Sequence, residues 1–307
     1  DMVRSKGFDL VFLDEMMPGM GGLRTLAEIK ELVPNLPVVM ITKNEAESLM
    51  EEAIGSKISD YLTKPVNPSQ VLLAVKKILE AKKITGEIVS RDYTQEFQEI
   101  SRALMNPLGA LEWMNLYSKL TNWEMELDEH TELGLGQTLL DQKRECNAEF
   151  SKFIEKNYRN WIEKDRGTRP VLSTDIVERY VLPLLSEKKT VLFFVIDCLR
   201  LDQWLVMERL LSDLFEIQKE FYFSILPTAT PYSRNAIFSG LFPSELEQRF
   251  PELWQSGEDD ESSRNRDEHL LLEKLLERRH AQLKPKYVKI IDPEFGRQVE
   301  NNILSYA

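Results

Sequence analysis

Short apolar runs alternate with amphipathic segments over the first part of the chain. Three of these runs are rich in β-branched and aromatic residues and predict buried strands: residues 8–14, 37–42 and 59–63. The segments between and after them have helical periodicity and predict helices at residues 23–32, 46–54 and 69–81. Strands that alternate with helices through short loops indicate a parallel sheet. We therefore expect an α/β domain over residues 1–83.

The same alternation returns toward the end of the chain. Apolar runs predict strands at residues 190–196, 221–226 and 287–291, and helical patterns cover residues 173–185, 205–214 and 270–279. A strand that is covered on both faces shows a continuous apolar run, as residues 190–196 (TVLFFVI) do. These patterns predict a second α/β domain over residues 170–307. The charged stretch 255–269 inside it predicts a solvated surface loop.

Residues 84–169 carry helical patterns only. They predict helices at residues 92–105, around 111–120 and over 139–162, the last with apolar residues at three- and four-residue spacing. Cys146 lies on that apolar stripe and is expected to be a core residue. The whole chain is thus predicted to be of the α/β class, with a three-helix domain between two α/β domains. Both α/β domains are expected to be truncated, because their strand patterns start or stop unfinished.

Composition narrows the class of protein further. The chain has 307 residues, with 39 basic and 51 acidic side chains and a formal net charge of −12. This balance disfavours sequence-independent binding to nucleic acid, and we find no basic recognition helix or helix-turn-helix, so no DNA-binding domain is expected. Two cysteines are too few for a disulfide framework. With no signal peptide or bilayer-spanning apolar run, the protein is expected to be cytoplasmic.

Three polar side chains stand at the carboxyl ends of the first three predicted strands: Asp14, Thr42 and Lys64. Because such ends meet at one edge of a parallel sheet, we expect these side chains to converge. The residues around them, DEMMPGMGG, T-K and K-P, resemble the motifs of the response-regulator receiver domain. The resemblance implies that Asp14 accepts phosphate from a sensor histidine kinase. It also implies that Thr42 hydrogen-bonds the phosphoryl group and that Lys64 pairs with it.

Two further roles follow from the receiver resemblance. Tyr61 would be the aromatic switch residue. Asp14 and the backbone carbonyl of Met16 would bind Mg²⁺ together with an acidic pair, which is expected to precede residue 1. Without that pair, the segment 1–83 by itself is not expected to be phosphorylated.

A second group of polar residues follows the strands predicted in the last domain. Asp197 ends the run 190–196, and the segment PTATPYSRNAIFSG places two threonine hydroxyls ahead of a helix with Pro231 in its first turn. A carboxylate at such a strand end faces the crevice where α/β sheets bind ligands, and the free N–H groups of a helix start favour an anion. By themselves, these residues also allow a simpler interpretation, in which Thr230 is only a helix cap and Asp197 only a carboxylate at the start of a helix; the Thr228 hydroxyl could equally be the cap.

The pattern P-T-x-T, an apolar helix and then S-G-L-x-P resembles the nucleophile segment of nucleotide phosphodiesterases in the alkaline phosphatase superfamily. The resemblance implies that Thr230 is the nucleophile, with Thr228 as the second choice, and that Asp197 and Thr230 bind zinc. Enzymes of this kind hold two zinc ions with additional Asp and His ligands. The sequence shows no matching Asp/His spacing, so the remaining ligands are expected beyond residue 307.

A receiver, a helical middle domain and a PglZ-type effector in one chain resemble the response regulators of the type IX secretion system in Bacteroidetes. The resemblance implies a zinc-dependent phosphodiesterase that acts on nucleotides or oligonucleotides under the control of a histidine kinase. It also implies a homodimer that forms on phosphorylation, through residues 44–81, and contacts with a secretion-machinery protein and a sigma factor. The alternative hypothesis is a phosphorylation-gated interaction module, in which the effector fold docks protein partners without needed catalysis.

Overall fold

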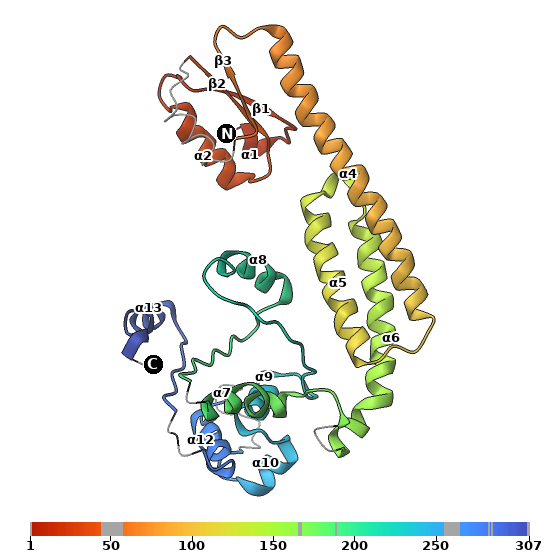
Figure 1. Cartoon of the computed structure of the whole chain (residues 1–307), viewed down its shortest axis with the longest axis vertical. Coiled ribbons are helices and arrows are strands. Elements are labelled where there is room, and N and C mark those ends of the chain that lie inside the picture. Colours follow the sequence, from red (N-terminus) through yellow and green to blue (C-terminus); the bar gives the residue numbers. More distant parts are fainter. Residues whose placement is uncertain are drawn as a thin grey trace. The chain divides into compact units, whose positions relative to one another are not determined.

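The computed structural model describes residues 2–43, 58–164, 168–187, 189–254, 265–281, 283 and 285–305. The helix predicted at 46–54 lies outside these residues, as does most of the charged stretch that begins at 255. The chain forms two compact units (Figure 1). The first comprises residues 1–107 and 116–147, and the second comprises residues 108–115 and 148–307.

The first unit contains the predicted parallel sheet. Its strands β1 (Val11–Asp14), β2 (Val38–Thr42) and β3 (Asp60–Thr63) lie in the order β1-β2-β3. Alternate residues of the central strand enter different clusters: Val38 and Met40 pack with α2 (Gly22–Leu32), whereas Val39 packs with Ala74 of the helix that follows β3. Burial on both faces explains the continuous apolar runs of these strands. The short helix α1 (Met2–Ser5) precedes β1.

The helix that follows β3 is much longer than the sequence pattern predicts. Helix α4 (Pro68–Leu104) runs for 37 residues and joins the two helices expected at 69–81 and 92–105. Asn67 caps its start by accepting a hydrogen bond from the Ser69 amide, at 2.9 Å, and Pro68 occupies the first turn. No proline follows until Pro107, so nothing interrupts the backbone hydrogen bonds between the two predicted pieces. The expected boundary at residue 84 therefore falls inside one helix.

Helices α5 (Ala110–Glu129) and α6 (Gly136–Glu163) complete the helical region, with the turn η1 (Thr131–Leu133) between them. Within the first unit, the buried Tyr93 of α4 packs edge-on against Trp123 at 5.3 Å between ring centroids. Gln142 of α6 is also buried and donates to the carbonyl of Phe97 at 3.1 Å. Cys146 is buried as predicted, and burial raises the pKa of its thiol to about 11.

The second unit is mostly helical. After the short η3 (Ser173–Asp175) and η4 (Val177–Val181), the helices among its described residues are α7 (Leu182–Ser186), α8 (Leu201–Leu211), α9 (Thr230–Ser239), α10 (Pro243–Arg249), α12 (Glu268–Arg278) and α13 (Pro293–Asn301). Helix α9 packs on α12 around a cluster that includes Phe238, Leu241 and Leu271. A second cluster joins Trp161 and Leu172 to Ile225 and Ala236.

The strands predicted in the second unit do not form. Residues 191–196 and 287–291 have no strand structure, and residues 221–226 contribute only the isolated bridge between Leu172 and Phe223. Phe194 and Ile196 are 65% and 56% exposed. A strand needs a neighbour to satisfy its backbone N–H and C=O groups, and apart from that bridge the described residues give these runs none.

Candidate functional site

Two groups of polar side chains are candidates for function, one in each unit. In the first unit, Asp14 ends β1 and Lys64 directly follows β3. The parallel register brings them together: the Lys64 ammonium donates a short hydrogen bond to Oδ2 of Asp14. The backbone N–H of Met16 donates to Oδ1 at 3.1 Å. The hydrogen bond from Lys64 and then that from Met16 lower the pKa of the Asp14 carboxyl below its ordinary value.

The other residues predicted for the receiver lie around this pair. Thr42 ends β2, and its hydroxyl donates to the carboxylate of Glu15, the residue after Asp14. Tyr61 lies on β3 and is 40% exposed, while the Met16 side chain is 74% exposed. The structure thus brings Asp14 and Lys64 into contact, and it places Thr42 against the neighbouring carboxylate of Glu15.

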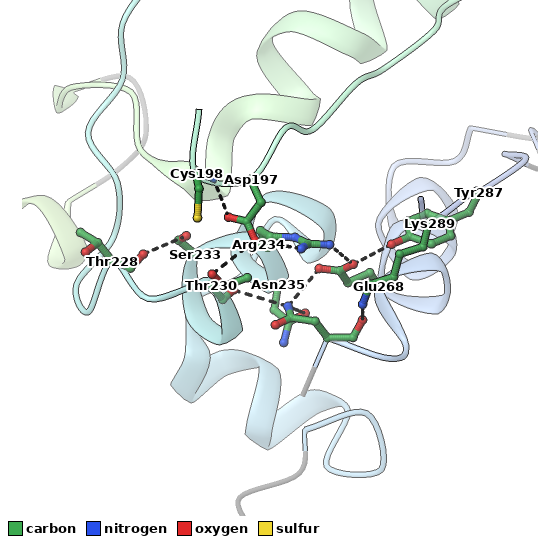
Figure 2. Close-up of polar contacts among 11 residues, drawn as sticks. Asp197, Cys198, Thr228, Thr230, Ser233, Arg234, Asn235, Glu268, Tyr287 and Lys289 are labelled. Atoms are coloured by element: carbon green, nitrogen blue, oxygen red, sulfur yellow. Dashed lines mark hydrogen bonds and ion pairs between the residues drawn. The ribbon is translucent and has the colours of Figure 1, made fainter. Parts of the chain in front are cut away.

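In the second unit, Asp197 and Thr230 come together although 33 residues separate them. Thr230 is the first residue of α9, and its hydroxyl donates to Oδ2 of Asp197 at 3.5 Å, the upper limit for a hydrogen bond (Figure 2). The helix cap is Ala229, without a side-chain hydrogen bond, so neither Thr228 nor Thr230 caps α9. Thr228 contributes its backbone carbonyl, which accepts from the Ser233 hydroxyl at 3.4 Å.

Arg234, one turn further along α9, connects Asp197 to a second carboxylate. Its Nη1 lies 3.2 Å from Oδ2 of Asp197, and its Nη2 lies 2.5 Å from Oε2 of Glu268 (Figure 2). Its buried Nε finds no hydrogen-bond partner among the described residues. Burial would lower the pKa of the guanidinium, but the charge of Glu268, together with Asp197, outweighs burial and raises it. Arg234 is therefore a cation that contacts the same Asp197 oxygen as the hydroxyl of Thr230.

Sequence reasoning missed Glu268. It lies in the stretch expected to be solvated surface, yet it is 0% exposed and begins α12. Besides Arg234, it accepts hydrogen bonds from Tyr287 Oη at 2.6 Å and from Asn265 Nδ2 at 2.9 Å. Burial, then the hydrogen bond to this carboxylate, raise the pKa of Tyr287 above its ordinary value. No sequence pattern marks Glu268, because its three donors come from separate parts of the chain.

The side chains present do not by themselves form a metal centre. Within the described ranges, no group of three or more His, Cys, Asp or Glu residues is close enough to hold a metal ion. Asp197 shares its Oδ2 between Thr230 and Arg234, and Asp14 shares its carboxylate between Lys64 and Met16. Thus the described residues complete neither the zinc site predicted at Asp197 and Thr230 nor the magnesium site predicted at Asp14 and Met16.

Among the described residues, no helix is both long enough and apolar enough to span a bilayer.

Comparison with protein families divides the chain into three parts. Residues 1–76 match the response regulator receiver domain, and residues 83–162 match the PorX response regulator linker domain. Residues 176–306 match the BREX system PglZ alkaline phosphatase-like domain. None of these three matches is described as a DNA-binding domain.

Curated relatives include a transcriptional regulatory protein and a heme response regulator. The transcriptional regulatory protein ZraR of Klebsiella oxytoca is 32% identical over 111 residues, which are 34% of this chain and 25% of ZraR. The heme response regulator HssR of Staphylococcus epidermidis is 26% identical over 152 residues, 43% of this chain and 67% of HssR. The chain thus spans only about a quarter of ZraR, so the activities of these relatives are not transferred to it.

Among solved structures, the response regulator DrrB of Thermotoga maritima, an OmpR/PhoB homolog, is 31% identical. The match covers 26% of this chain and 37% of DrrB, with a TM-score of 0.25, which is too low to support an argument about the fold. The identity of the chain therefore rests on the three family matches and the order in which they occur. A receiver, a PorX linker and a PglZ alkaline phosphatase-like domain follow one another along the chain, which is a response regulator with the PorX domain architecture.

Proposed function

We propose that this response regulator controls a phosphodiesterase of the alkaline phosphatase superfamily, with Asp14 as phosphoacceptor and Thr230 as nucleophile. The observation that carries the proposal is the contact between Thr230 Oγ1 and Asp197 Oδ2, at 3.5 Å, in the PglZ-like part of the chain. Residues 33 positions apart meet at the start of a helix, where free N–H groups favour an anionic substrate. Nucleotides or oligonucleotides are the substrate class that we propose.

We propose a simple task for each side chain. In the reaction, the Thr230 oxygen forms a bond to phosphorus and its proton passes to the carboxylate of Asp197. The P–O bond to one ester oxygen breaks, and Asp197 returns the proton to that oxygen, so the first alcohol or nucleoside leaves. Water then attacks the phosphorus of the Thr230 phosphodiester, one water proton passes to the Thr230 oxygen as its P–O bond breaks, and the phosphate monoester is released. Arg234 lies 3.2 Å from Asp197 and supplies a positive charge beside the reacting phosphate oxygens.

Metal requirements remain part of the proposal. The resemblance to the alkaline phosphatase superfamily predicts Zn²⁺ at Asp197 and Thr230, and the receiver predicts Mg²⁺ at Asp14 and Met16. Because the described side chains complete neither site, no step above depends on a metal. Metal analysis of the purified full-length protein, with activity measured before and after chelation, tests both predictions.

The regulatory half of the proposal concerns Asp14. Phosphorylation adds charge beside Lys64, which already contacts the Asp14 carboxylate, and would change the contacts at the carboxyl edge of the sheet. We propose that this change favours a homodimer, and that a secretion-machinery protein of the type IX system and a sigma factor are partners. The dimer surface that we expect begins at residue 44, and residues 44–57 lie outside the described ranges. Sedimentation with and without a phosphoryl mimic tests the dimer.

One observation favours the second hypothesis, an interaction module that docks proteins without needed catalysis. Leu192, Phe194 and Ile196, just before Asp197, are 46%, 65% and 56% exposed. Exposed apolar side chains so close together are typical of surfaces that another part of a protein, or another protein, covers.

A pair of substitutions separates the two hypotheses. Thr230→Val keeps the shape of the side chain and removes its oxygen, so it should abolish hydrolysis of bis(p-nitrophenyl) phosphate by the full-length protein. Thr228→Val is the matched control. It removes the same atom two residues away, on an exposed side chain that does not cap α9, and should leave the rate unchanged. If only Thr228→Val abolishes turnover, the nucleophile is Thr228. If neither changes a measurable rate, the interaction module is correct.

A further inference from the structure

Among the described residues of the second unit, the carboxylate of Glu268 is the most enclosed charge. Its relative exposure is 0%, and three side chains donate hydrogen bonds to it: Arg234, Tyr287 and Asn265. We infer that Glu268 is a positioning residue for hydrolysis at Thr230, because it holds Arg234 against Asp197 and Asn265 against the first turn of α9. This inference rests on the proposed function, and its test has a separate readout.

Two of the three donors also touch the reacting group of residues. Arg234 bonds to Glu268 through Nη2 and to Asp197 through Nη1, so each carboxylate fixes one end of the guanidinium. Asn265 Nδ2 lies 2.9 Å from Glu268 and 3.4 Å from the carbonyl oxygen of Thr230. Glu268 is thus one side chain away from both Asp197 and the backbone of Thr230, along two independent routes.

Further contacts fix the partners of Glu268. Asn265 Nδ2 also lies 3.2 Å from Oδ1 of the buried Asn235, whose own Nδ2 donates to the carbonyl of Pro231 at 2.9 Å. The backbone oxygen of Asn265 accepts from the Lys289 ammonium at 3.1 Å. The first turn of α9 is therefore tied to the start of α12 by side-chain hydrogen bonds rather than by apolar packing alone.

Stability by itself is a weak reason for such an arrangement. Removing a carboxylate and a guanidinium from water is energetically costly, and apolar side chains of similar volume would often be as stable. A buried ion pair does define one geometry, because each hydrogen bond fixes the direction of its partner. Here that geometry places the Arg234 cation 3.2 Å from Asp197 and within one helical turn of Thr230.

Helix packing sets the register of the pair. Arg234 projects from α9 and Glu268 from the start of α12, and the two helices are joined by the apolar cluster of Phe238, Leu241 and Leu271. Since close-packed side chains permit little sliding, the distance between Arg234 and Glu268 is fixed by the core beneath them. Arg234 is accordingly held by Glu268 through Nη2 and contacts Asp197 through Nη1.

The first test uses steady-state kinetics of the full-length protein with bis(p-nitrophenyl) phosphate. Glu268→Gln keeps the shape and removes the charge, and should lower kcat about 10- to 100-fold, as loss of positioning contacts does, with KM changed less than about threefold. Tyr287→Phe removes a single hydrogen bond to Glu268 and should lower kcat about threefold. If Glu268→Gln fails to fold, Tyr287→Phe decides: a threefold lower kcat supports the inference, and a wild-type kcat overturns it.

Two matched controls separate positioning from stability. Glu277→Gln makes the same chemical change on α12, at an exposed residue that pairs with Lys274, and should leave kcat unchanged. Asp175→Asn removes another buried charge, the partner of Arg169, and should lower the melting temperature with kcat changed less than about twofold. The inference is overturned if Glu268→Gln and Asp175→Asn lower kcat equally, or if Glu268→Gln leaves kcat at the wild-type value.

The second readout does not depend on activity. The Nε–H group of Arg234, assigned by its loss in Arg234→Lys, should give a slowly exchanging signal in ¹⁵N NMR spectra, because it is buried. Glu268→Gln should increase its exchange rate at least about tenfold, whereas Glu277→Gln should not. Unchanged exchange in Glu268→Gln overturns the inference. If the wild-type protein shows no hydrolysis, the proposed phosphodiesterase function fails, and the Arg234 signal alone decides whether Glu268 holds this arginine.

Discussion

The glycine at position 22 provides a sharp test of the receiver site. Gly22 is the first residue of α2 and lies against the end of β1, where its N–H donates to the carbonyl of Glu15 at 2.9 Å. A Cβ added to Gly22 would lie 2.5 Å from the carbonyl oxygen of Asp14 and 2.7 Å from the Cα of Glu15. Both contacts are with backbone atoms, so relief requires β1 or α2 to move. We expect Gly22→Ala to destabilise this edge of the sheet.

The size of the effect follows from two opposing contributions. Overpacking a site of this kind costs about 1–3 kcal/mol, and two backbone contacts below 3.0 Å place Gly22 at the upper end of that range. Replacing glycine by alanine in a helix contributes about 1 kcal/mol in the opposite direction. The net loss should be about 2 kcal/mol, or roughly a 30-fold increase in local opening.

Gly21→Ala is the matched control for this substitution. A Cβ at Gly21 meets nothing within 4 Å, and its φ of −64° and ψ of 158° suit alanine. Gly21 is the N-cap of α2, a position where alanine is less favourable than glycine, so a loss of about 0.5 kcal/mol is expected. The two substitutions are thus chemically identical, one residue apart, and differ in the space around the added methyl group.

Hydrogen exchange measured by mass spectrometry is the appropriate assay, because it reports local opening in a chain with two compact units. Peptides that contain β1 and the start of α2 should exchange roughly 30-fold faster in Gly22→Ala than in the wild type. The exchange rates of the same peptides should change less than about threefold in Gly21→Ala. Equal protection in the two variants would refute the steric argument.

Three other predictions concern labelling, thiols and the core. Acetyl phosphate with Mg²⁺ should label the full-length protein on Asp14 and should not label Asp14→Ala; persistent labelling would exclude this phosphoacceptor. At pH 8 a thiol reagent should modify the exposed Cys198 quickly and the buried Cys146 only after unfolding, because a pKa of about 11 leaves roughly one thiolate in 1,000 at Cys146. The reaction of Cys146 should become faster as the pH rises toward 11. Rapid modification of the folded Cys198→Ser variant, which keeps only Cys146, at the rate of Cys146→Ser, which keeps only Cys198, would contradict this. Leu275→Ala, at 0% exposure, should cost about 2–5 kcal/mol in urea unfolding, whereas Leu210→Ala, at 74% exposure, should cost less than about 0.5 kcal/mol; equal effects would contradict the described packing.

Much of the first unit was predictable from the sequence. Its three strands are short apolar runs that pair in chain order, and a parallel register places Asp14 and Lys64 at the same edge. These features depend on local periodicity and on short loops, both of which are visible in the residues themselves. The burial of Cys146 was predictable for the same reason, since it lies on the apolar stripe of a long helix.

Other features depend on partners that no local pattern identifies. The run 191–196 reads as a buried strand, yet without a neighbouring strand among the described residues it stays irregular and exposed. The gap expected between the helices at 69–81 and 92–105 is absent, because no proline interrupts the backbone hydrogen bonds of α4 there. An apolar pattern indicates that a segment can be buried, but a second segment has to supply the surface that buries it.

The candidate site in the second unit shows the same division. The sequence by itself determined that Asp197 follows an apolar run and that Thr230 precedes an apolar helix, because both depend on residues close in the chain. Only the tertiary structure decided that Glu268, from a highly charged stretch, is buried beneath Arg234. The physical reason is that a carboxylate is solvated by default and becomes a core residue only where folding brings enough donors to replace water.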